Sequence, residues 1–356
     1  MAFPLADWID GHDDCRHNLA KSGMKDAIPA PTPSARDLRE ADPAELRRLL
    51  AEDLGVDPAR VFLTTGASQA NAVALLFLGR TRHGEPTGRC RVCFPEYPPL
   101  FDTARWAGFR ATDDPGPVDL AVISQPRNPE GDLWERTRVL DWASDARWLL
   151  VDETFREFAG ARSMLGVGRP NLWATGSFTK FFAADDLRVG FVVPPEECLS
   201  DFARFAGLVR NLLPSYSVAG ALRALREREA IRKRVRAVLE ANTSALRSSF
   251  PEMRRPDSPV VFDRPATGED GDALARRALE ASVLVCSGSF FGDPTGVRLC
   301  LTQRTFPADL DAYRAIRDFA AEGPRPQKGR PIPTGRTGRA VRPRPGGSGR
   351  AKAAPS

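Results

Sequence analysis

Short apolar segments alternate with helical segments from residue 61 to residue 193, and this alternation constrains the fold more than any other feature of the chain. The strand candidates are apolar along most of their length, which is typical of parallel strands covered by helices on both faces. In chain order they are a strand that begins at Val61, then Arg91–Phe94, Leu120–Ser124, Trp148–Asp152, Asn171–Ser177 and Arg188–Val193. We therefore predict an α/β fold with a mainly parallel sheet, whose ligands gather at the carboxyl ends of the strands.

Helical patterns separate these strand candidates. Asp42–Leu54 begins with Asp-Pro, a helix cap followed by proline at the first helical position, and its leucines share one face. Further candidates are a helix that begins near Ser68, then Pro98–Ala107 and Glu135–Asp145. After Pro195 the pattern changes to long charged helices, Glu196–Asn211 and Val218–Ser248, followed by mixed segments. This change predicts a large domain over residues 41–205 and a smaller α+β domain over residues 206–320.

The last segment, residues 321–356, differs from the rest in charge and composition. It holds nine Lys or Arg residues and one acid, so the other residues carry 42 basic and 45 acidic side chains and the body is mildly acidic. The segment is rich in Pro, Gly and Arg and contains few large apolar residues, so burial cannot offset the entropy lost on ordering. We predict a disordered basic tail, and do not expect it to bind nucleic acid because no aromatic residues are interleaved for base stacking.

The six cysteines are scattered through a long chain, and no basic, apolar leader or membrane-length apolar run is found. These features predict a reduced, cytoplasmic protein that does not enter a membrane. Cys90 and Cys93 have the spacing of a metal-binding pair, but no second pair and no neighbouring histidine completes a zinc set. No metal site is predicted.

Three polar segments follow strand candidates. Gly66–Gln69 lies between a strand and a helix, where backbone N–H groups and the helix dipole can bind a phosphate; an ordinary turn is the alternative. Ser124–Gly131 contains an Asn-Pro at the end of a strand and could also be a plain turn. Asp152 and Glu153 end an apolar strand, so a cationic partner is needed, and a protonated pyridine nitrogen is one candidate.

Three basic groups lie in similarly apolar surroundings. Lys180 is embedded among aromatic and hydroxyl side chains in Gly176–Phe182, where desolvation lowers the pKa of an amine and makes it a nucleophile and base. Eight residues later, Arg188 begins an apolar strand candidate and could bind a phosphate through two hydrogen bonds. Arg298 lies inside the strand candidate Val297–Leu301, where it needs an anion: a substrate carboxylate, or the partner in a structural ion pair.

Taken together and in this order, these segments resemble the fold-type I aminotransferases of class I/II that depend on pyridoxal 5′-phosphate (PLP), and among them the histidinol-phosphate aminotransferase branch. The resemblance covers roughly residues 62–301, and the Ser-x-x-Lys segment followed by Leu-Arg-Val-Gly is its most specific part. It implies the aspartate aminotransferase-like PLP-transferase fold, a homodimer, and residues 1–40 as a segment near the substrate mouth.

The resemblance also implies roles for individual residues. Lys180 would carry PLP as a Schiff base and shuttle a proton, and Asp152 would keep the pyridine nitrogen protonated. Asn128 would bind the phenolic oxygen, Tyr97 would stack on the ring, and Arg298 would bind the substrate carboxylate. The expected phosphate contacts are Ala67, Ser68, Gln69, Ser177 and Arg188. Asn18, in the segment His17–Gly23 that resembles the one crossing the mouth in relatives, is expected to bind substrate, whereas His17 is expected to be structural.

The chain departs from the family pattern at three places. Phe155, which the resemblance places among the cofactor-binding residues, stands where the family usually has a tyrosine whose hydroxyl also reaches the phenolic oxygen. Ala183–Asp186 replaces a small, glycine-containing linker, and its two acids are expected in a solvated loop without an assigned role. The tyrosine that a neighbouring subunit supplies in relatives has no clear counterpart in Pro31–Glu40.

The sequence therefore predicts an aminotransferase that moves an amino group from an amino acid to a 2-oxo acid by a ping-pong mechanism. A PLP-dependent decarboxylase of the threonine-phosphate decarboxylase type remains an alternative, because the cofactor residues are shared. A non-catalytic PLP-fold scaffold is disfavoured by the retained Lys180, Asp152 and Arg188. A Rossmann dehydrogenase is disfavoured because the glycine turn at Gly66 lacks the G-x-G-x-x-G pattern.

Overall fold

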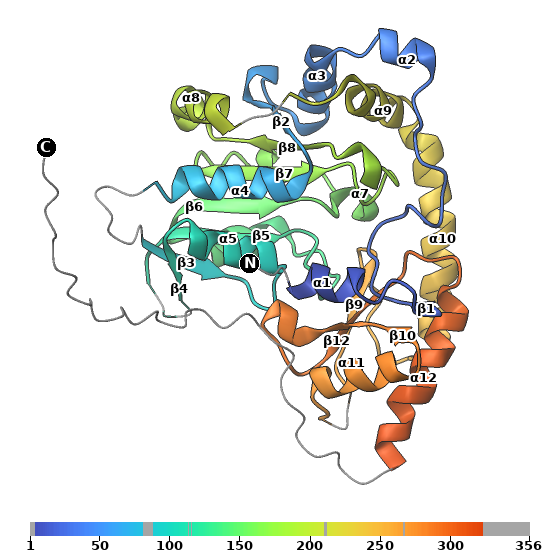
Figure 1. Cartoon of the computed structure of the whole chain (residues 1–356). Coiled ribbons are helices and arrows are strands. Elements are labelled where there is room, and N and C mark those ends of the chain that lie inside the picture. The colour runs from blue at the N-terminus through green and yellow to red at the C-terminus, as the bar shows by residue number, and fades with distance from the viewer. Residues whose placement is uncertain are drawn as a thin grey trace, which may run out of the picture.

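The computed structural model describes residues 4–80, 88–112, 114, 116–209, 212–265 and 268–322. Two sheets with their own helices make up most of this part of the chain (Figure 1). The long helix α10 (Arg228–Ser249) runs along one side of the molecule, from the neighbourhood of α9 (Ser215–Arg226) to the smaller sheet. The expected tail begins within α12 (Phe306–Glu322), and the rest of that prediction lies outside the described residues.

The larger sheet has seven strands in the order β2-β8-β7-β6-β5-β3-β4. Only β8 is antiparallel to its neighbours, so the prediction of a mainly parallel sheet is confirmed. The strand expected from Arg188 in fact begins at Gly190, because Arg188 has left-handed backbone angles (φ 50°) that end the preceding turn. The strands are β2 (Phe62–Thr64), β3 (Gly88–Val92), β4 (Phe109–Ala111), β5 (Val118–Ser124), β6 (Ala146–Asp152), β7 (Leu172–Ser177) and β8 (Gly190–Val193).

Both faces of this sheet are buried, which explains why its strands are apolar without alternation. In β5, Leu120 and Val122 belong to the apolar cluster under α4, α5 and α8, whereas Ala121 and Ile123 belong to the cluster under α6. The helices of the large sheet are α4 (Ala67–Leu78), α5 (Pro98–Trp106), α6 (Arg136–Trp142), α7 (Arg156–Ala159) and α8 (Leu199–Val209), with short 3-10 turns at Met164–Val167, Asp185–Leu187 and Glu196–Cys198.

The helix α3 (Pro43–Leu54) forms as its sequence signals predict. The carboxylate of Asp42 accepts a hydrogen bond from the Ala44 N–H at 2.8 Å, and Gly55 ends the helix with φ 69°. The prediction of a single helix over Val218–Ser248 was wrong, because the chain leaves helical geometry at Glu227 and forms two helices, α9 and α10. Near α3 lie α2 (Ala35–Arg39), which packs on α9, and a 3-10 turn at Pro58–Arg60.

The smaller sheet is antiparallel in the order β11-β12-β9, with strands at Cys286–Ser287, Val297–Cys300 and Val260–Asp263. Its core lies against α10, α11 (Gly271–Glu280) and α12. The N-terminal segment is fixed to this unit, since β1 (His17–Asn18) pairs in parallel with β10 (Val283–Leu284). The indole N–H of Trp8 in α1 (Pro4–Asp10) donates to the Val285 carbonyl at 2.8 Å, and a 3-10 turn covers Gly288–Phe291. Within the described ranges, no helix has the length and apolar character needed to cross a membrane.

Gly190 is required where the turn before α4 approaches the sheet. A Cβ atom at Gly190 would lie 2.4 Å from the carbonyl carbon of Gly66 and 2.8 Å from the carbonyl oxygen of Gly176. Both neighbours are backbone, so neither can rotate away. A Cβ atom at Gly207, on the exposed face of α8, would meet no atom within 4 Å.

We predict that Gly190→Ala lowers the free energy of unfolding by about 1–3 kcal/mol, because the added methyl group pushes Gly66 away from the sheet. Chemical denaturation measures this loss. The control Gly207→Ala should be neutral or stabilising by up to about 1 kcal/mol, because it removes a helical glycine without a clash. Equal effects of the two substitutions would contradict the close approach at Gly190.

Candidate active site

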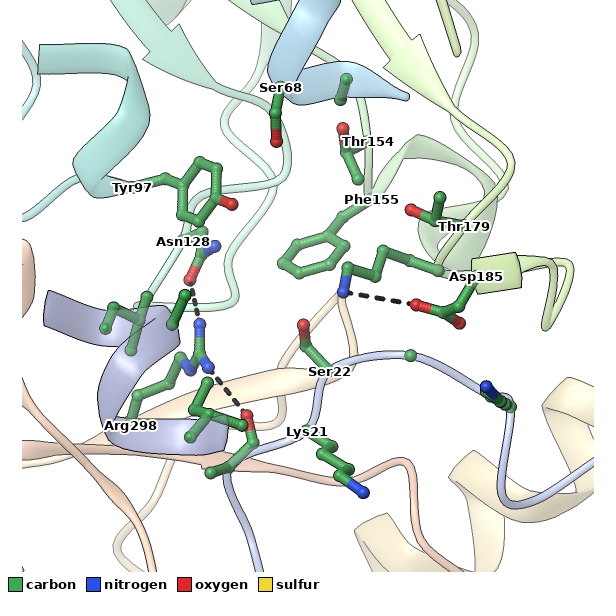
Figure 2. Close-up of a pocket in the computed structure, with 18 of the residues that line it drawn as sticks. Lys21, Ser22, Ser68, Tyr97, Asn128, Thr154, Phe155, Thr179, Asp185 and Arg298 are labelled. Atoms are coloured by element: carbon green, nitrogen blue, oxygen red, sulfur yellow. Dashed lines mark hydrogen bonds and ion pairs between the residues drawn. The ribbon is translucent and has the colours of Figure 1, made fainter. Parts of the chain in front are cut away.

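A cavity of about 850 Å³ lies between the carboxyl ends of the large sheet's strands and the smaller sheet. Figure 2 shows Tyr97, Asn128, Phe155 and Arg298 around it, contributed by both units. The N-terminal segment contributes the remaining wall through α1 and residues 20–26. Of the predicted site residues, the structure brings these together in the lining: Ala67, Ser68, Tyr97, Asn128, Asp152, Phe155, Lys180, Arg188 and Arg298.

Three predicted residues do not line the cavity. The Gln69 side chain turns back to accept hydrogen bonds from the N–H and hydroxyl of Thr65, at 2.7 and 3.0 Å. The Ser177 hydroxyl lies beside that of Thr179 and donates to the Val189 carbonyl at 3.2 Å. The Asn18 side chain accepts from the N–H groups of the two residues after Leu19, at 3.0 and 3.3 Å. These residues shape the turns that carry the lining.

Asp152 is a buried carboxylate at the end of β6. One oxygen accepts from the Asn71 amide at 2.7 Å and the other from the Thr154 N–H at 2.9 Å. No Lys, Arg or His in the described part of the chain forms an ion pair with it. Burial raises the pKa of Asp152, while the hydrogen bonds from Thr154 and Asn71 oppose the rise. A cationic ligand group in the cavity would remove this cost.

Lys180 follows β7 in a loop whose three phenylalanines, at 178, 181 and 182, are buried in the core. The packing of these rings holds the lysine backbone, while 32% of the lysine side chain remains exposed to the cavity. Burial lowers the pKa of the Lys180 amine, and the charges of Arg298 and Arg188 lower it further. The direction expected from the sequence is therefore confirmed, and the amine is a candidate nucleophile and base.

A candidate anion site lies at the N-terminus of α4. Gly66, with φ 98°, precedes this helix, and a Cβ there would lie 2.9 Å from a guanidinium nitrogen of Arg188. That guanidinium also donates to the Thr65 carbonyl at 3.4 Å. Free helical N–H groups, the Ser68 hydroxyl and Arg188 together form a suitable binding site for a phosphate.

Arg298 is a buried cation whose contacts are all neutral. Its guanidinium donates to Asn128 Oδ1 at 3.3 Å and to the Ala20 carbonyl at 2.9 Å, as the dashed lines in Figure 2 show. The Nε atom has no hydrogen-bond partner, and within the described residues no carboxylate pairs with the side chain. The contact to Asn128 leaves the amide nitrogen of Asn128 available to donate to a ligand. A carboxylate ligand would satisfy Arg298.

A buried glutamate positions Tyr97 and Asn128. Glu96, which is fully buried, accepts hydrogen bonds from the N–H of Tyr97 at 2.7 Å and from the N–H and hydroxyl of Ser124 at 2.8 and 2.6 Å. The same Ser124 oxygen accepts from the Asn128 N–H at 2.9 Å. Burial raises the pKa of Glu96 to about 7, partly opposed by Arg127 and these hydrogen bonds.

Sequence reasoning missed several residues of this site. Asn71 and Glu96 are polar groups within apolar or proline-rich surroundings, and that contrast was the available signal for a buried hydrogen-bond network. The prediction that both acids after Ala184 lie in a solvated loop is correct for Asp186 and wrong for Asp185. Asp186 is exposed and pairs with Lys25 at 2.8 Å, but Asp185 lines the cavity, 3.8 Å from the Lys180 amine.

Two structural expectations can also be checked. His17 lies 2.9 Å from the Asp309 carboxylate in the smaller unit, in agreement with a structural role. Cys90 and Cys93 are both buried, and burial raises the pKa of each thiol to about 12. In the described part of the chain no group of three or more His, Cys, Asp or Glu residues could hold a metal ion.

The donors and charges around the cavity fit PLP. Among the described residues, no cation pairs with the buried carboxylate of Asp152 and no anion pairs with the buried guanidinium of Arg298; Ser68 and Arg188 line the same cavity. A nucleophilic lysine lies among them. This is the arrangement of a protein class that holds an aromatic phosphate cofactor on a lysine and binds a carboxylate substrate beside it.

Comparison with known proteins agrees with the geometry. The family model for aminotransferase class I and II matches residues 38–309, and the chain belongs to this family. The predicted family, fold and class of PLP-dependent aminotransferase are thereby confirmed.

The individual relatives are distant. A histidinol-phosphate aminotransferase from Chromohalobacter salexigens is 28% identical over 72% of this chain and 74% of its own length. A threonine-phosphate decarboxylase from Pseudomonas aeruginosa is 28% identical over 58% of this chain, which matches 61% of that relative's length. A PLP-dependent aminotransferase structure from Streptococcus suis superimposes with a TM-score of 0.76 at 18% identity, covering 92% of this chain and 99% of that one, and shows the fold.

We predict a pH dependence that originates at Glu96. Its pKa is raised in the folded state, from the ordinary 4.5 to about 7, so the folded protein binds the proton more tightly than the unfolded chain. The contribution of Glu96 to the free energy of unfolding should therefore be largest below pH 4.5 and fall as the pH rises to about 7.

Denaturation of the wild type and Glu96→Gln across this range measures the effect. Because Gln replaces one acceptor oxygen with an amide donor, we expect a loss of about 1–3 kcal/mol. The difference from the wild type should be greatest at low pH, because only the wild type loses stability as the pH rises through the raised pKa of Glu96. Glu197→Gln, which removes an exposed carboxylate in the turn Glu196–Cys198, serves as the control. A difference between wild type and Glu96→Gln that is constant with pH would show that Glu96 does not titrate in this range.

Proposed function

We propose that this chain uses Lys180 to bind PLP covalently and moves an amino group from an amino acid to a 2-oxo acid. The observation that carries the proposal is the placement of the Lys180 amine in one cavity with two buried charges, Asp152 and Arg298, that have no ionic partner among the described residues. Asp152 would pair with the protonated ring nitrogen of the cofactor, and Arg298 would pair with the carboxylate of the substrate. The family membership supports the same reaction class.

Individual residues of the cavity would have separate roles in this reaction. When bound, PLP supplies an electron-withdrawing ring that makes the Cα proton of an amino acid acidic. Asp152, oriented by Asn71, would hold a proton on the ring nitrogen, and Arg188 with the N-terminus of α4 would hold the phosphate. Lys180 would take the proton from Cα and release it again after the amino group has moved.

Other lining groups would fix the orientation of the reactants. Tyr97 would stack on the ring, and Asn128 would donate to the phenolic oxygen while its own oxygen is held by Arg298. Phe155, packed with Phe158, Val260 and Cys300, would cover the ring without donating a hydrogen bond. Arg298 would bind the substrate carboxylate, which places the Cα–H bond near the Lys180 amine.

A decarboxylase of the threonine-phosphate decarboxylase type is the second candidate, and the similarity to the Pseudomonas aeruginosa relative favours it specifically. Both reactions use the same cofactor residues, and they differ in which bond at Cα is broken. Purified protein should be supplied with a panel of amino acids. Release of carbon dioxide without an oxo acid would identify the decarboxylase, whereas an oxo acid and an aminated cofactor would identify the aminotransferase.

The wider assignments are proposals of the same kind. We propose a cytoplasmic homodimer, and all six cysteines are free, which agrees with a reducing compartment. We propose the division into residues 41–205 and 206–320 because the smaller sheet has its own apolar core, although residues 218–235 pack in a cluster that also contains residues of the large domain. Residues 1–40 are proposed as the segment at the substrate mouth, since α1 and residues 20–26 line the cavity. Nucleic acid is not a proposed partner.

The central test is borohydride reduction of protein that has been saturated with PLP. We expect a pyridoxyl group on Lys180, found by peptide mass spectrometry, and loss of both the adduct and the cofactor absorbance in Lys180→Ala. Lys21 lines the same cavity but pairs with Asp13 at its mouth, so Lys21→Ala is the matched control and should retain both signals. An unmodified Lys180 in the wild type would exclude the proposed function.

A further inference from the structure

The acid that follows the Lys180 loop has an unusual environment. Asp185 begins the 3-10 turn Asp185–Leu187, and one carboxylate oxygen lies 3.8 Å from the Lys180 amine (Figure 2, dashed line). The other oxygen, Oδ2, is fully buried and has no hydrogen-bond partner. A Cβ on Gly23 would lie 3.1 Å from that oxygen, so the N-terminal segment closes directly over the carboxylate.

The same segment is tied to the lysine itself. The Met24 N–H donates to the Lys180 carbonyl at 2.9 Å, so Lys180, Asp185 and the segment at Gly23 form one local unit. Only 27% of the Asp185 side chain is exposed, compared with 78% for Asp186, which pairs with Lys25 toward solvent. Adjacent acids therefore have different environments, and only Asp185 faces the cavity.

The charges around this pair come from several elements. The groups facing Lys180 are Asp185, the guanidinium groups of Arg298 and Arg188, and the Cys300 thiol of β12. Both guanidinium groups lower the pKa of the amine and Asp185 raises it. Asp185 in turn faces Lys180, Lys25, Arg188 and Asp186, and its own pKa is raised chiefly by burial. The negative charge of Asp185 thus opposes the effect of Arg298 and Arg188 on the pKa of the Lys180 amine.

We propose that Asp185 is a positioning residue for the reaction: it holds the free amine of Lys180 at the cavity wall and stabilises the protonated form of that amine. The inference rests on the proposed function, because it concerns the stages at which Lys180 is not bound to the cofactor. At those stages Lys180 accepts the proton that leaves the substrate Cα, and becomes an ammonium. The nearby carboxylate stabilises this ammonium and remains unprotonated itself, so no further proton donor or acceptor is required.

The test measures the amine without relying on turnover. Full-length protein from which the cofactor has been stripped is labelled by reductive methylation over a range of pH, and the extent at Lys180 is read by peptide mass spectrometry. Since 32% of the side chain is exposed, the reagent can reach it. The variants are Asp185→Asn, which keeps the shape, and Asp185→Ala, which places no amide beside the amine. Asp186→Asn is the matched control, with the same charge change one residue away.

We expect the midpoint pH of Lys180 labelling to fall by about 1 in both Asp185 variants, because an opposite charge at this distance favours the ammonium by at least this amount. Asp186→Asn should leave the midpoint unchanged. In the loaded enzyme, kcat should fall several-fold in Asp185→Asn while KM for the amino acid stays nearly constant, because the substrate contacts are intact.

Three results would overturn the proposal: an unchanged midpoint in both Asp185 variants, an equal shift in Asp186→Asn, or a shift in Asp185→Asn that Asp185→Ala does not reproduce. Each of these is distinguishable from failure of the proposed function. Borohydride labelling of Lys180 should persist in the Asp185 variants, and its absence in the wild type would reject the cofactor assignment instead. Thermal unfolding of each variant identifies any that does not fold.

Discussion

The site depends on the register between three parallel strands. Ser124 at the end of β5 pairs with Asp152 at the end of β6, and Asp152 pairs with Thr175 near the end of β7. The main chain continues these ladders beyond the strands, through hydrogen bonds from Gln125 to Asp152 and from Glu153 to Thr175, both 2.8 Å long. The Ser124 hydroxyl then accepts from the Asn128 N–H, and the Thr175 hydroxyl donates to Asn71, which in turn donates to Asp152. A shift of one residue would turn the three strand side chains to the other face of the sheet.

Burial of the Asp152 and Arg298 charges costs desolvation free energy, and no ionic partner among the described residues offsets this cost. In the described part of the chain, the hydrogen-bond donors to Asp152 and the acceptors for Arg298 are neutral. Buried charges without ionic partners are destabilising, and they concentrate at binding sites because a ligand can supply the missing partner. The hydrogen bonds from Thr175 to Asn71 and from Asn71 to Asp152 limit the cost by orienting the carboxylate before any ligand arrives.

The smaller sheet completes the site through a contact between residues far apart in the chain. Arg298 of β12 reaches Asn128, which follows β5, while the Ala20 carbonyl from the N-terminal segment accepts from the same guanidinium. The segment at Ala20 is held by the pairing of β1 with β10 and by the link from Met24 to Lys180. The cavity is therefore closed by three parts of the chain, and a change in any of them alters the environment of the lysine.

The sequence alone determined the α/β class, the strand candidates and most of the polar groups at their ends, because uninterrupted apolar strands and local helix caps are encoded by neighbouring residues. Tertiary structure decided which of those groups face the cavity. The Gln69 and Asn18 side chains accept from backbone N–H groups of nearby residues. Of the two acids after Ala184, one faces the cavity and the other faces solvent. The direction of each side chain depends on contacts between residues that are distant in sequence, such as Asn71 with Asp152 or Gly23 with Asp185. A local sequence pattern does not encode such contacts.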